Sequence, residues 1–305
     1  MIGHPATLQE LSNEYAKKQP HQVNYLLEET PILAGIKFEV ASHALWNVAE
    51  KVTGIEGADF VPMNSPLPEM NVDSGLEQVD LNIMGGEIFV PQDKAQAYGG
   101  KEKYIAKRMP VLLKDAGNRT EKRIIYGNYR KYALDNGKVQ SATGVAGDEL
   151  FSMIIVRSVA GENGGLYSPE GFKQGAMLDV QPLYNGGLMK DSRGVAGYGV
   201  QVKGYFGMQI LNPKTMSAIV NIAPDKLPTV RQISKALSDA RANPANTKIL
   251  MHPLLLGYLG DEYKKEMLRV TNNDKGINTQ IVSWNEIPVL SSYNFMEGTE
   301  GFETI

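Results

Sequence analysis

The chain has 305 residues, of which 42% are hydrophobic and 21% charged, and its formal net charge is −3. This length is enough for one large domain or two ordinary ones, and the composition is typical of a globular protein. The weak net charge does not by itself indicate a nucleic-acid or membrane partner, and the absence of cysteine excludes disulfides, thiolate metal sites and thiol catalysis.

Residues 1–30 are predicted to form an extended arm. Thr7 can cap one short helix, and the stretch VNYLLEET can form a second helix that Pro31 ends. Neither piece can build a core alone, so we expect the arm to lie against another part of the assembly. The arm has no apolar signal-peptide core, and no run in the chain approaches the roughly 20 apolar residues of a membrane span. We therefore expect synthesis in the cytosol.

Residues 37–90 are predicted to form a long hairpin. Apolar residues alternate over 37–52 and again over 76–90, which predicts two strands, with a bulge at Gly85-Gly86 where the parity changes. The connection between them is rich in Gly, Pro, Asn and Ser. A compact domain rarely leaves a loop of this length unused, so we expect the tip to contact a partner.

Residues 101–126 are the best candidate for a long helix. Pro110 and Gly117 are expected to bend or break it. Between Lys101 and Arg123 it carries eight Lys or Arg against three Asp or Glu. Taken alone, such a stretch is typical of a solvated helix face.

A glycine-rich middle region, residues 144–197, is predicted to form short strands and loops. Strict alternation over residues 197–211 then predicts a strand of about 50 Å with one buried and one open face. The following stretch, NPKTMSAIVNI, is predicted to open a helix with Asn212 as its cap and Pro213 at its first position.

The last third of the chain predicts a compact alternation of helices and strands. Thr229 is expected to cap a helix, TKILM to form a buried strand, and PLLLGYLGDEYKKEMLRV to form a second helix. TQIVSW and IPVLSSYNF are predicted to be closing strands.

The sequence lacks the residue patterns of the common catalytic and cofactor sites. The four histidines are His4, His21, His43 and His252, and none is spaced as a metal ligand of another. There is no Gly-x-Ser-x-Gly turn and no phosphate-binding loop, and the glycines of GVAGYGVQVKG enter a strand instead of opening a helix. We interpret His252 as a loop residue before a helix that starts with proline. We therefore expect no cofactor, no metal and no enzymatic activity. The arm, the long hairpin and the long helix include segments that cannot be buried within one subunit, which indicates an assembly protein.

Four stretches, in this order, resemble the tailed-bacteriophage major capsid proteins of the Hong Kong 97 type. ETPILAGIKFEV resembles the arm entering an extended loop, and FVPQDKAQAYGGKEKYIAKRM resembles the loop returning into a long spine helix. EKRIIYGN resembles the end of that helix, and VKGYFGMQILNPKTMSAIVNI resembles the strand that leads toward the axial domain. The resemblance covers most of the chain.

The resemblance implies an α+β capsid fold with five parts. Residues 1–36 would be the N-arm, 37–95 the extended loop, and 96–222 a peripheral domain with the spine helix and glycine-rich strands. Residues 223–288 would form the axial domain, and 289–305 would return to the peripheral domain.

The resemblance also implies a structural subunit that forms hexamers and pentamers of an icosahedral shell around double-stranded DNA. On this basis, the residues expected to contact a neighbouring subunit are Trp46, Val48, Val52, Phe60, Leu67, Leu81 and Ile83. Residues expected to face DNA from the spine helix, through sequence-independent attraction, are Lys101, Lys103, Lys107, Arg108 and Lys114.

Further partners are expected from the same resemblance. They are a separate scaffolding protein and a portal protein, with assembly in the host cytoplasm, a final location in the virion, and no membrane contact. We assign no covalent crosslink, although Lys51 lies on the loop. Two alternatives stay open: an encapsulin-like shell around protein cargo and, with less support, an α/β enzyme.

Overall fold

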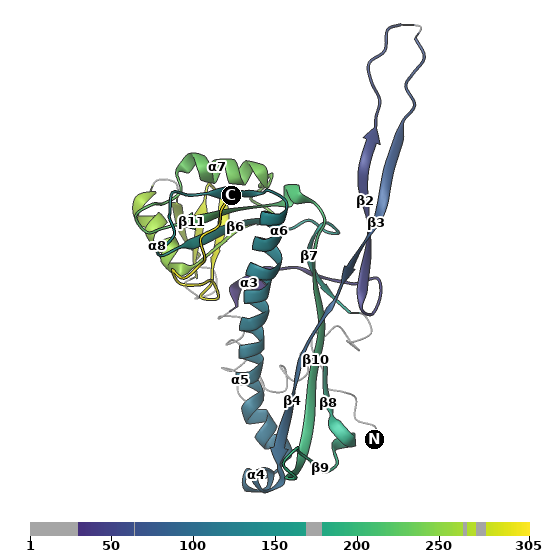
Figure 1. The fold of residues 1–305 in the computed structure, drawn as a ribbon, viewed down its shortest axis with the longest axis vertical. Helices are drawn as coiled ribbons and strands as arrows, with labels where there is room; N and C mark the ends of the chain where they lie inside the picture. The colour runs from purple at the N-terminus through teal and green to yellow at the C-terminus, as the bar shows by residue number, and fades with distance from the viewer. Residues whose placement is uncertain (1–29, 64, 169–178, 265–266, 273–278) are drawn as a thin grey trace.

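The computed structural model describes residues 30–63, 65–168, 179–264, 267–272 and 279–305. The two short helices expected in the arm lie outside the described residues. The described chain forms a long unit beside one extended helix, a compact unit, and a hairpin that projects beyond both (Figure 1). It thus mixes helices and sheets, as the sequence predicts.

The long unit is built on the strand β10 (Ala196–Ile210), whose 15 residues confirm the predicted long strand. Among the described residues, β10 pairs with β4 (Asn82–Pro91) along one edge and with β7 (Asn163–Tyr167) along part of the other. The remaining strands of this sheet are β1 (Phe38–Val40), β8 (Asp179–Pro182) and β9 (Met189–Lys190).

The expectation that β10 leaves one face open is wrong. Gly199, Gly207 and Gln209 on its small-residue face are buried. A Cβ on Gly199 would lie 2.5 Å from Met189 Sδ, and one on Gly207 would lie 2.6 Å from Leu81 Cδ2. Short neighbouring segments therefore cover this face, and the small residues make room for them.

The two predicted hairpin strands are each divided in the structure. Residues 37–52 contain β1, which pairs with β7, and the start of β2 (Trp46–Glu56), which pairs with β3 (Asn71–Asp80). Residues 76–90 divide at the buried Leu81, where β3 ends and β4 begins. The predicted bulge at Gly85-Gly86 is wrong, since the β4–β10 register runs through it without a shift. The parity changes because Ile83 lies on the exposed face of β4, whereas Ile88 and the buried Val90 lie on the opposite face.

The long helix α5 covers Lys101–Lys122, and neither Pro110 nor Gly117 breaks it. It continues without interruption into η1 (Arg123–Arg130), a π-helix, and then into α6 (Lys131–Asp135). The small helix α4 (Gln92–Ala97) precedes it at the end of β4. The continuous helix therefore runs from the far end of the long sheet to the compact unit (Figure 1).

The compact unit contains a sheet that has seven strands among the described residues, in the order β13-β14-β15-β12-β6-β11-β5. The bounds are β5 (Val139–Ser141), β6 (Phe151–Arg157), β11 (Met216–Ile222), β12 (Thr247–Met251), β13 (Met267–Asn272), β14 (Thr279–Trp284) and β15 (Ile287–Ser291). Six residues of β6 and all seven of β11 are buried. The central strands are therefore covered on both faces, which explains their continuous apolar sequences.

Each face of this sheet packs on different helices. One face packs on α7 (Val230–Asp239) and α8 (Pro253–Glu262), with Ile233 and Leu255 in the core. The other face packs on η1, α6 and the short helix α3 (Pro31–Gly35), with Tyr129 among the buried side chains. The C-terminal end of the continuous helix is thus part of the compact unit.

The predicted capping of α7 by Thr229 is confirmed, because its hydroxyl accepts from Gln232 N and the Gln232 side chain accepts from Thr229 N. Two helix predictions are wrong. After Asn212, which does cap Pro213–Thr215 (η3), the chain enters β11 because its β-branched residues fill the centre of the sheet. The second helix ends at Glu262, and Met267 already belongs to β13.

The compact sheet crosses the boundaries predicted for the domains. It takes β6 and β11 from residues 96–222 and β12 from residues 223–288. The strand expected to leave for the peripheral domain, β15, instead pairs in parallel with β12, with Val289 opposite Ile249. The buried central strands of this sheet thus pair with strands from distant segments of the chain.

Candidate subunit-contact surfaces

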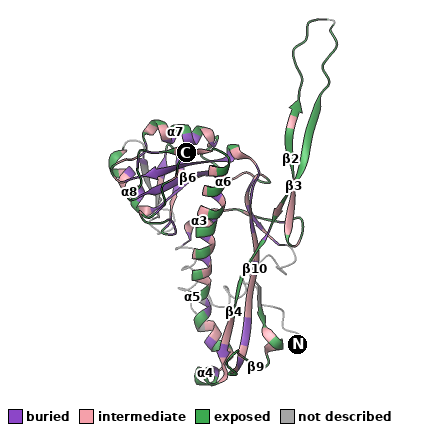
Figure 2. Cartoon of the chain, in the orientation of Figure 1, coloured by how far each residue is buried: buried purple, intermediate pink, exposed green. Residues whose placement is uncertain are grey.

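The hairpin formed by β2, β3 and the described residues between them, 57–63 and 65–70, projects away from the rest of the subunit. Among the described strands, β2 and β3 pair only with each other. The register runs from Trp46 opposite Asp80 to Glu56 opposite Asn71, with one shift between Val52 and Gly54. Figure 2 shows that the hairpin is exposed over most of its length, in contrast to the buried centre of the compact sheet.

Large apolar side chains are exposed along this hairpin. Phe60 is 102% exposed and Met63 is 93% exposed. The others are Val52, Ile55, Val61, Leu67, Met70, Val72 and Leu76. A soluble monomer rarely shows so many apolar groups in one projecting segment, and such patches mark interaction surfaces.

The base of the hairpin is anchored within the subunit. Leu81 packs with Ala41 and Leu166 in a small core, and Leu81 N donates to Leu45 O at 2.8 Å. The Asn47 side chain donates to Gln209 Oε1 of β10 at 2.5 Å. The hairpin therefore leaves the body of the protein from a fixed point.

The residues predicted to contact a neighbour fall into three groups. Val52, Phe60, Leu67 and Ile83 are exposed. Trp46 and Val48 are half-buried, and the Trp46 ring stacks on the His43 ring with centroids 3.5 Å apart. Leu81 is only 8% exposed and belongs to the subunit's own core, so its prediction as a contact residue is wrong. Alternation alone does not distinguish a core residue at the base from a contact residue on the arm.

The hairpin is also strongly acidic. Residues 46–80 contain seven acidic side chains and one basic side chain, Lys51. Lys51 donates to Glu77 across the strands at 2.8 Å, and this hydrogen bond raises the pKa of Lys51. Both partners are about half exposed, so the pair contributes little to stability.

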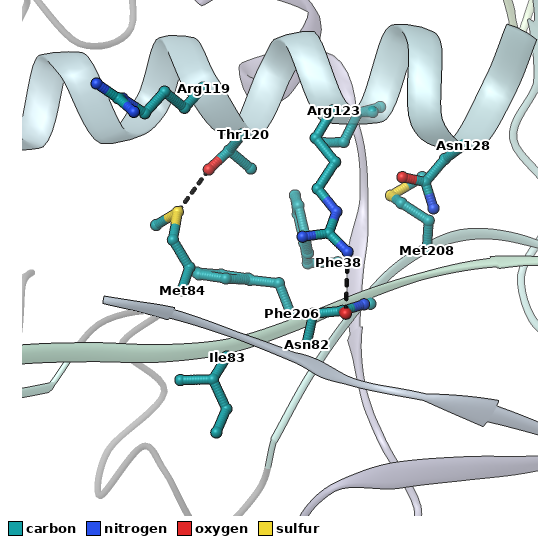
Figure 3. A pocket seen from close by; sticks show the side chains of 12 residues that line it. Phe38, Asn82, Ile83, Met84, Arg119, Thr120, Arg123, Asn128, Phe206 and Met208 are labelled. Carbon is teal, nitrogen blue, oxygen red and sulfur yellow. Dashed lines mark hydrogen bonds between the residues drawn. The ribbon is translucent and has the colours of Figure 1, made fainter. Parts of the chain in front are cut away.

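A second surface lies where α5 and η1 pass over β4 and β10 (Figure 3). A cavity of about 170 Å³ is lined there by apolar side chains that include Phe38, Met84, Phe206 and Met208. Arg123 donates to Asn82 Oδ1 at 3.0 Å, and the Thr120 hydroxyl lies 2.6 Å from Met84 Sδ. A neighbouring cavity of about 290 Å³ is lined by Met109 and Leu112 of α5 with β4.

Sequence reasoning did not locate this pair of cavities, since they form only where the helix crosses the sheet. Their lining offers apolar walls and two arginines, Arg119 and Arg123, but no nucleophile beside a general base. The cavities could hold an apolar side chain rather than carry out chemistry.

The basic residues predicted to face DNA have different environments along α5. Lys103 and Arg108 are exposed, and Lys114 is half-buried. Lys101 donates to Gly186 O at 2.9 Å and lies 4.9 Å from the Tyr198 ring centroid, so it anchors a loop of the long unit. The side chain of Lys107 lies outside the described residues.

The described residues contain no group of three or more His, Cys, Asp or Glu that could hold a metal ion. His252 is the N-cap of α8, and its Nδ1 accepts from Leu254 N at 3.2 Å, as its interpretation as a loop residue before the helix implies. Burial lowers its pKa. In the described part of the chain, no helix is both long enough and apolar enough to cross a membrane.

Comparisons with solved structures identify the fold. A chain of the bacteriophage JBD30 capsid matches with a TM-score of 0.54 and 10% identity, over 87% of this chain and 91% of that one. A chain of the bacteriophage Epsilon15 structure matches with a TM-score of 0.50 and 13% identity, over 85% and 86%. A chain of the SrpI encapsulin complex of Synechococcus elongatus gives a TM-score of 0.46 and 13% identity, over 66% and 90%. No family model and no curated protein matches the sequence.

The JBD30 and Epsilon15 matches each cover at least 85% of this chain and 86% of the matched chain. The chain therefore has the Hong Kong 97-type fold of tailed-phage capsid structures, as the sequence resemblance predicts.

Proposed function

We propose that this chain is the major capsid protein of a tailed bacteriophage. It would act as a structural subunit that assembles into hexamers and pentamers of an icosahedral shell around double-stranded DNA. The capsid fold supports this proposal, and the projecting hairpin is the observation that carries it. Function would depend on complementary surfaces and not on bond chemistry.

The hairpin supports self-association for two reasons. Its exposed apolar side chains, including Phe60 and Leu67, gain stability only when another surface removes them from water. Its excess of acidic groups would be repelled by the phosphates of nucleic acid, which favours a protein partner. Many such weak contacts would add up over a closed shell.

We assign the parts of the proposed subunit by the structural units and not by the boundaries predicted along the sequence. The hairpin would be the extended loop, and the long sheet with α5 would be the peripheral domain. The compact sheet with α7 and α8 would be the axial domain, including β6, β11 and β15. Residues 1–36 would supply the N-arm.

The proposed partners are those of a phage assembly pathway. They are further copies of the chain, a separate scaffolding protein, a portal protein and the packaged DNA. The subunit would assemble in the host cytoplasm and remain in the virion. Exposed Lys103 and Arg108 support an attraction between the spine helix α5 and DNA phosphates.

The proposal is tested with a variant that changes only the hairpin tip, Phe60→Ser with Leu67→Ser. Both side chains are exposed in the subunit, so folding and thermal stability should be unchanged. Assembly should require at least about tenfold more protein, because each large apolar group contributes about 1.5–3 kcal/mol on burial. Light scattering and negative-stain electron microscopy measure the critical concentration.

Val145→Ser is the control, since Val145 is also an exposed apolar residue, at 52%, but lies on the compact unit. Equal assembly of the tip variant and the parent would contradict the role of the hairpin. A parent chain that remains monomeric in all conditions would contradict a shell function altogether. Native particles filled with protein instead of DNA would assign the shell to the encapsulin-like alternative.

A further inference from the structure

The π-helix η1 lies at the position where the continuous helix passes from the long sheet to the compact sheet. Extended π-helices are rare, and π-helical segments often occur at functional sites. Here Ile124, Ile125 and Tyr129 are buried, and they belong to the core that covers one face of the compact sheet. η1 therefore packs the continuous helix against the compact sheet.

A segment near the C-terminus contacts η1 through Tyr126. The Tyr126 hydroxyl donates to Glu300 Oε1 at 2.7 Å and accepts from Met296 N at 2.7 Å. The Tyr126 ring also meets the Phe295 ring edge-on, with centroids 6.2 Å apart. Both hydrogen-bonding roles of this hydroxyl are thus used by residues that lie about 170 positions away in sequence.

Arg130, one turn further along η1, contacts the same segment. Its guanidinium lies 3.6 Å from the carboxylate of Glu300 and 3.3 Å from that of Glu303. Only 11% of the Arg130 side chain and 1% of the Glu300 side chain are exposed. The guanidinium also lies 5.7 Å from the Tyr126 ring centroid.

The segment is attached to the compact sheet on its other side. Ser152 of β6 donates to Glu300 Oε1 at 2.9 Å, and Leu150 N donates to Gly298 O at 3.2 Å. The side-chain amide of Asn221, at the end of β11, donates to Glu303 O at 2.7 Å and accepts from Glu303 N at 2.9 Å. Residues 295–303 therefore contact both η1 and the compact sheet.

We propose that residues 295–303 form a C-terminal clamp, in which Glu300 and Glu303 hold η1 in its π-helical form through Tyr126 and Arg130. The clamp thereby fixes the orientation of the compact sheet relative to α5 and the long sheet. Releasing the clamp frees the π-helical segment to change its helical winding, so the compact sheet samples several orientations. Because the clamp acts within one chain, it is tested without any assembled shell.

The chain has no cysteine, so two spin labels can be introduced at chosen sites. Lys103→Cys on α5 and Lys235→Cys on α7 place them on exposed positions of the two units. Pulsed electron resonance then measures the distance between the labels in the unassembled subunit. The parent should give one narrow distribution, and Glu300→Ala should broaden it at least twofold or shift its maximum.

Glu297→Gln is the matched control because Glu297 is exposed and lies three residues before Glu300. It should leave the distribution unchanged. If Glu300→Ala does not fold, Tyr126→Phe replaces it, because this change removes one hydroxyl and keeps the ring. Hydrogen exchange of the amides of residues 295–303 reports whether the clamp has opened.

Faster exchange in residues 295–303 together with a broader or shifted distance distribution supports the proposal. Faster exchange with an unchanged distribution overturns it, because the clamp would then open without freeing the compact sheet. Unchanged exchange also overturns it, because Glu300 and Tyr126 would then not be what holds the segment.

Discussion

Single residues show how burial separates structural side chains from surface ones of the same type. Leu81 and Leu67 both lie in the segment predicted as an extended loop, yet Leu81 is 8% exposed and Leu67 is 80% exposed. The first supports the subunit's own core and the second is available to a partner. Glu300 shows the same separation among carboxylates, since it is buried whereas Glu297 is exposed.

The burial of Glu300 predicts a pH dependence of stability. Burial raises the pKa of Glu300 above its ordinary value of 4.5, although Arg130, Tyr126 and Ser152 act in the opposite direction. Between 4.5 and the raised pKa, the folded chain keeps a proton that the unfolded chain releases. The contribution of Glu300 to the free energy of unfolding is therefore present at low pH and lost as pH rises through the raised pKa.

Denaturant unfolding of the parent and of Glu300→Gln, measured from pH 4 to pH 8, tests this expectation. The parent's free energy of unfolding, relative to that of the variant, should fall as the pH rises. Glu297→Gln serves as the comparison at an exposed site. The opposite result is a free energy of unfolding of the parent, relative to that of Glu300→Gln, that rises with pH. It would show that the pairing of the Glu300 carboxylate with Arg130, which also faces Glu303, outweighs the effect of its burial.

At the scale of elements, the pairing of β4 with β10 determines which glycines are required. Gly85 and Gly86 are adjacent in β4, and both lie opposite β10. A Cβ on Gly85 would overlap Val202 O and lie 3.2 Å from Lys203 Cα, both of which are backbone atoms. A Cβ on Gly86 would meet nothing within 4 Å.

These two positions make a matched pair of substitutions. Gly85→Ala should destabilise the subunit by about 1–3 kcal/mol, because the backbone of β10 must move away. Gly86→Ala should change stability by less than about 1 kcal/mol, in either direction. Thermal and denaturant unfolding measure both, and equal effects at the two positions would contradict the close approach of β4 to β10.

At the scale of the whole molecule, charge is distributed unevenly between the projecting hairpin and the spine helix. Residues 46–80 carry seven acidic groups and one basic group, whereas residues 101–123 carry eight basic groups and three acidic ones. The charges of the two segments nearly cancel, so the net charge of −3 reveals neither the acidic hairpin nor the basic helix. This distribution supports the proposed roles, in which the helix faces phosphate and the hairpin contacts protein.

Substituting the exposed basic residues of the helix tests this role. The double variant Lys103→Gln with Arg108→Gln should weaken binding of the subunit to a short DNA duplex. The slope of log K against log salt should become shallower by about 0.9 for each phosphate that the variant no longer neutralises. Arg231→Gln with Lys235→Gln removes the same charge from exposed positions on α7, and an equal weakening in that control would contradict a specific role for the spine helix.

The sequence by itself determined the elements that local patterns specify. Strict alternation predicted the long strand β10, Thr229 as a helix cap predicted the start of α7, and residues 101–126 were the candidate for the long helix α5. The order of four short stretches was also sufficient to predict the capsid fold, which the structural comparisons confirm. These features depend on contacts between residues close in sequence, or on short sequence stretches that can be recognised even at low overall identity.

Only the tertiary structure decided which residues lie next to each other across long separations. It brought β6, β11 and β15 into one sheet, placed Leu81 in the core, and formed the cavities between α5 and β4. It also brought Glu300 to Tyr126 and Arg130 of η1. An apolar or acidic residue has the same local pattern whether it faces its own core, a neighbour or solvent, and the packing of distant segments alone determines which of these it meets.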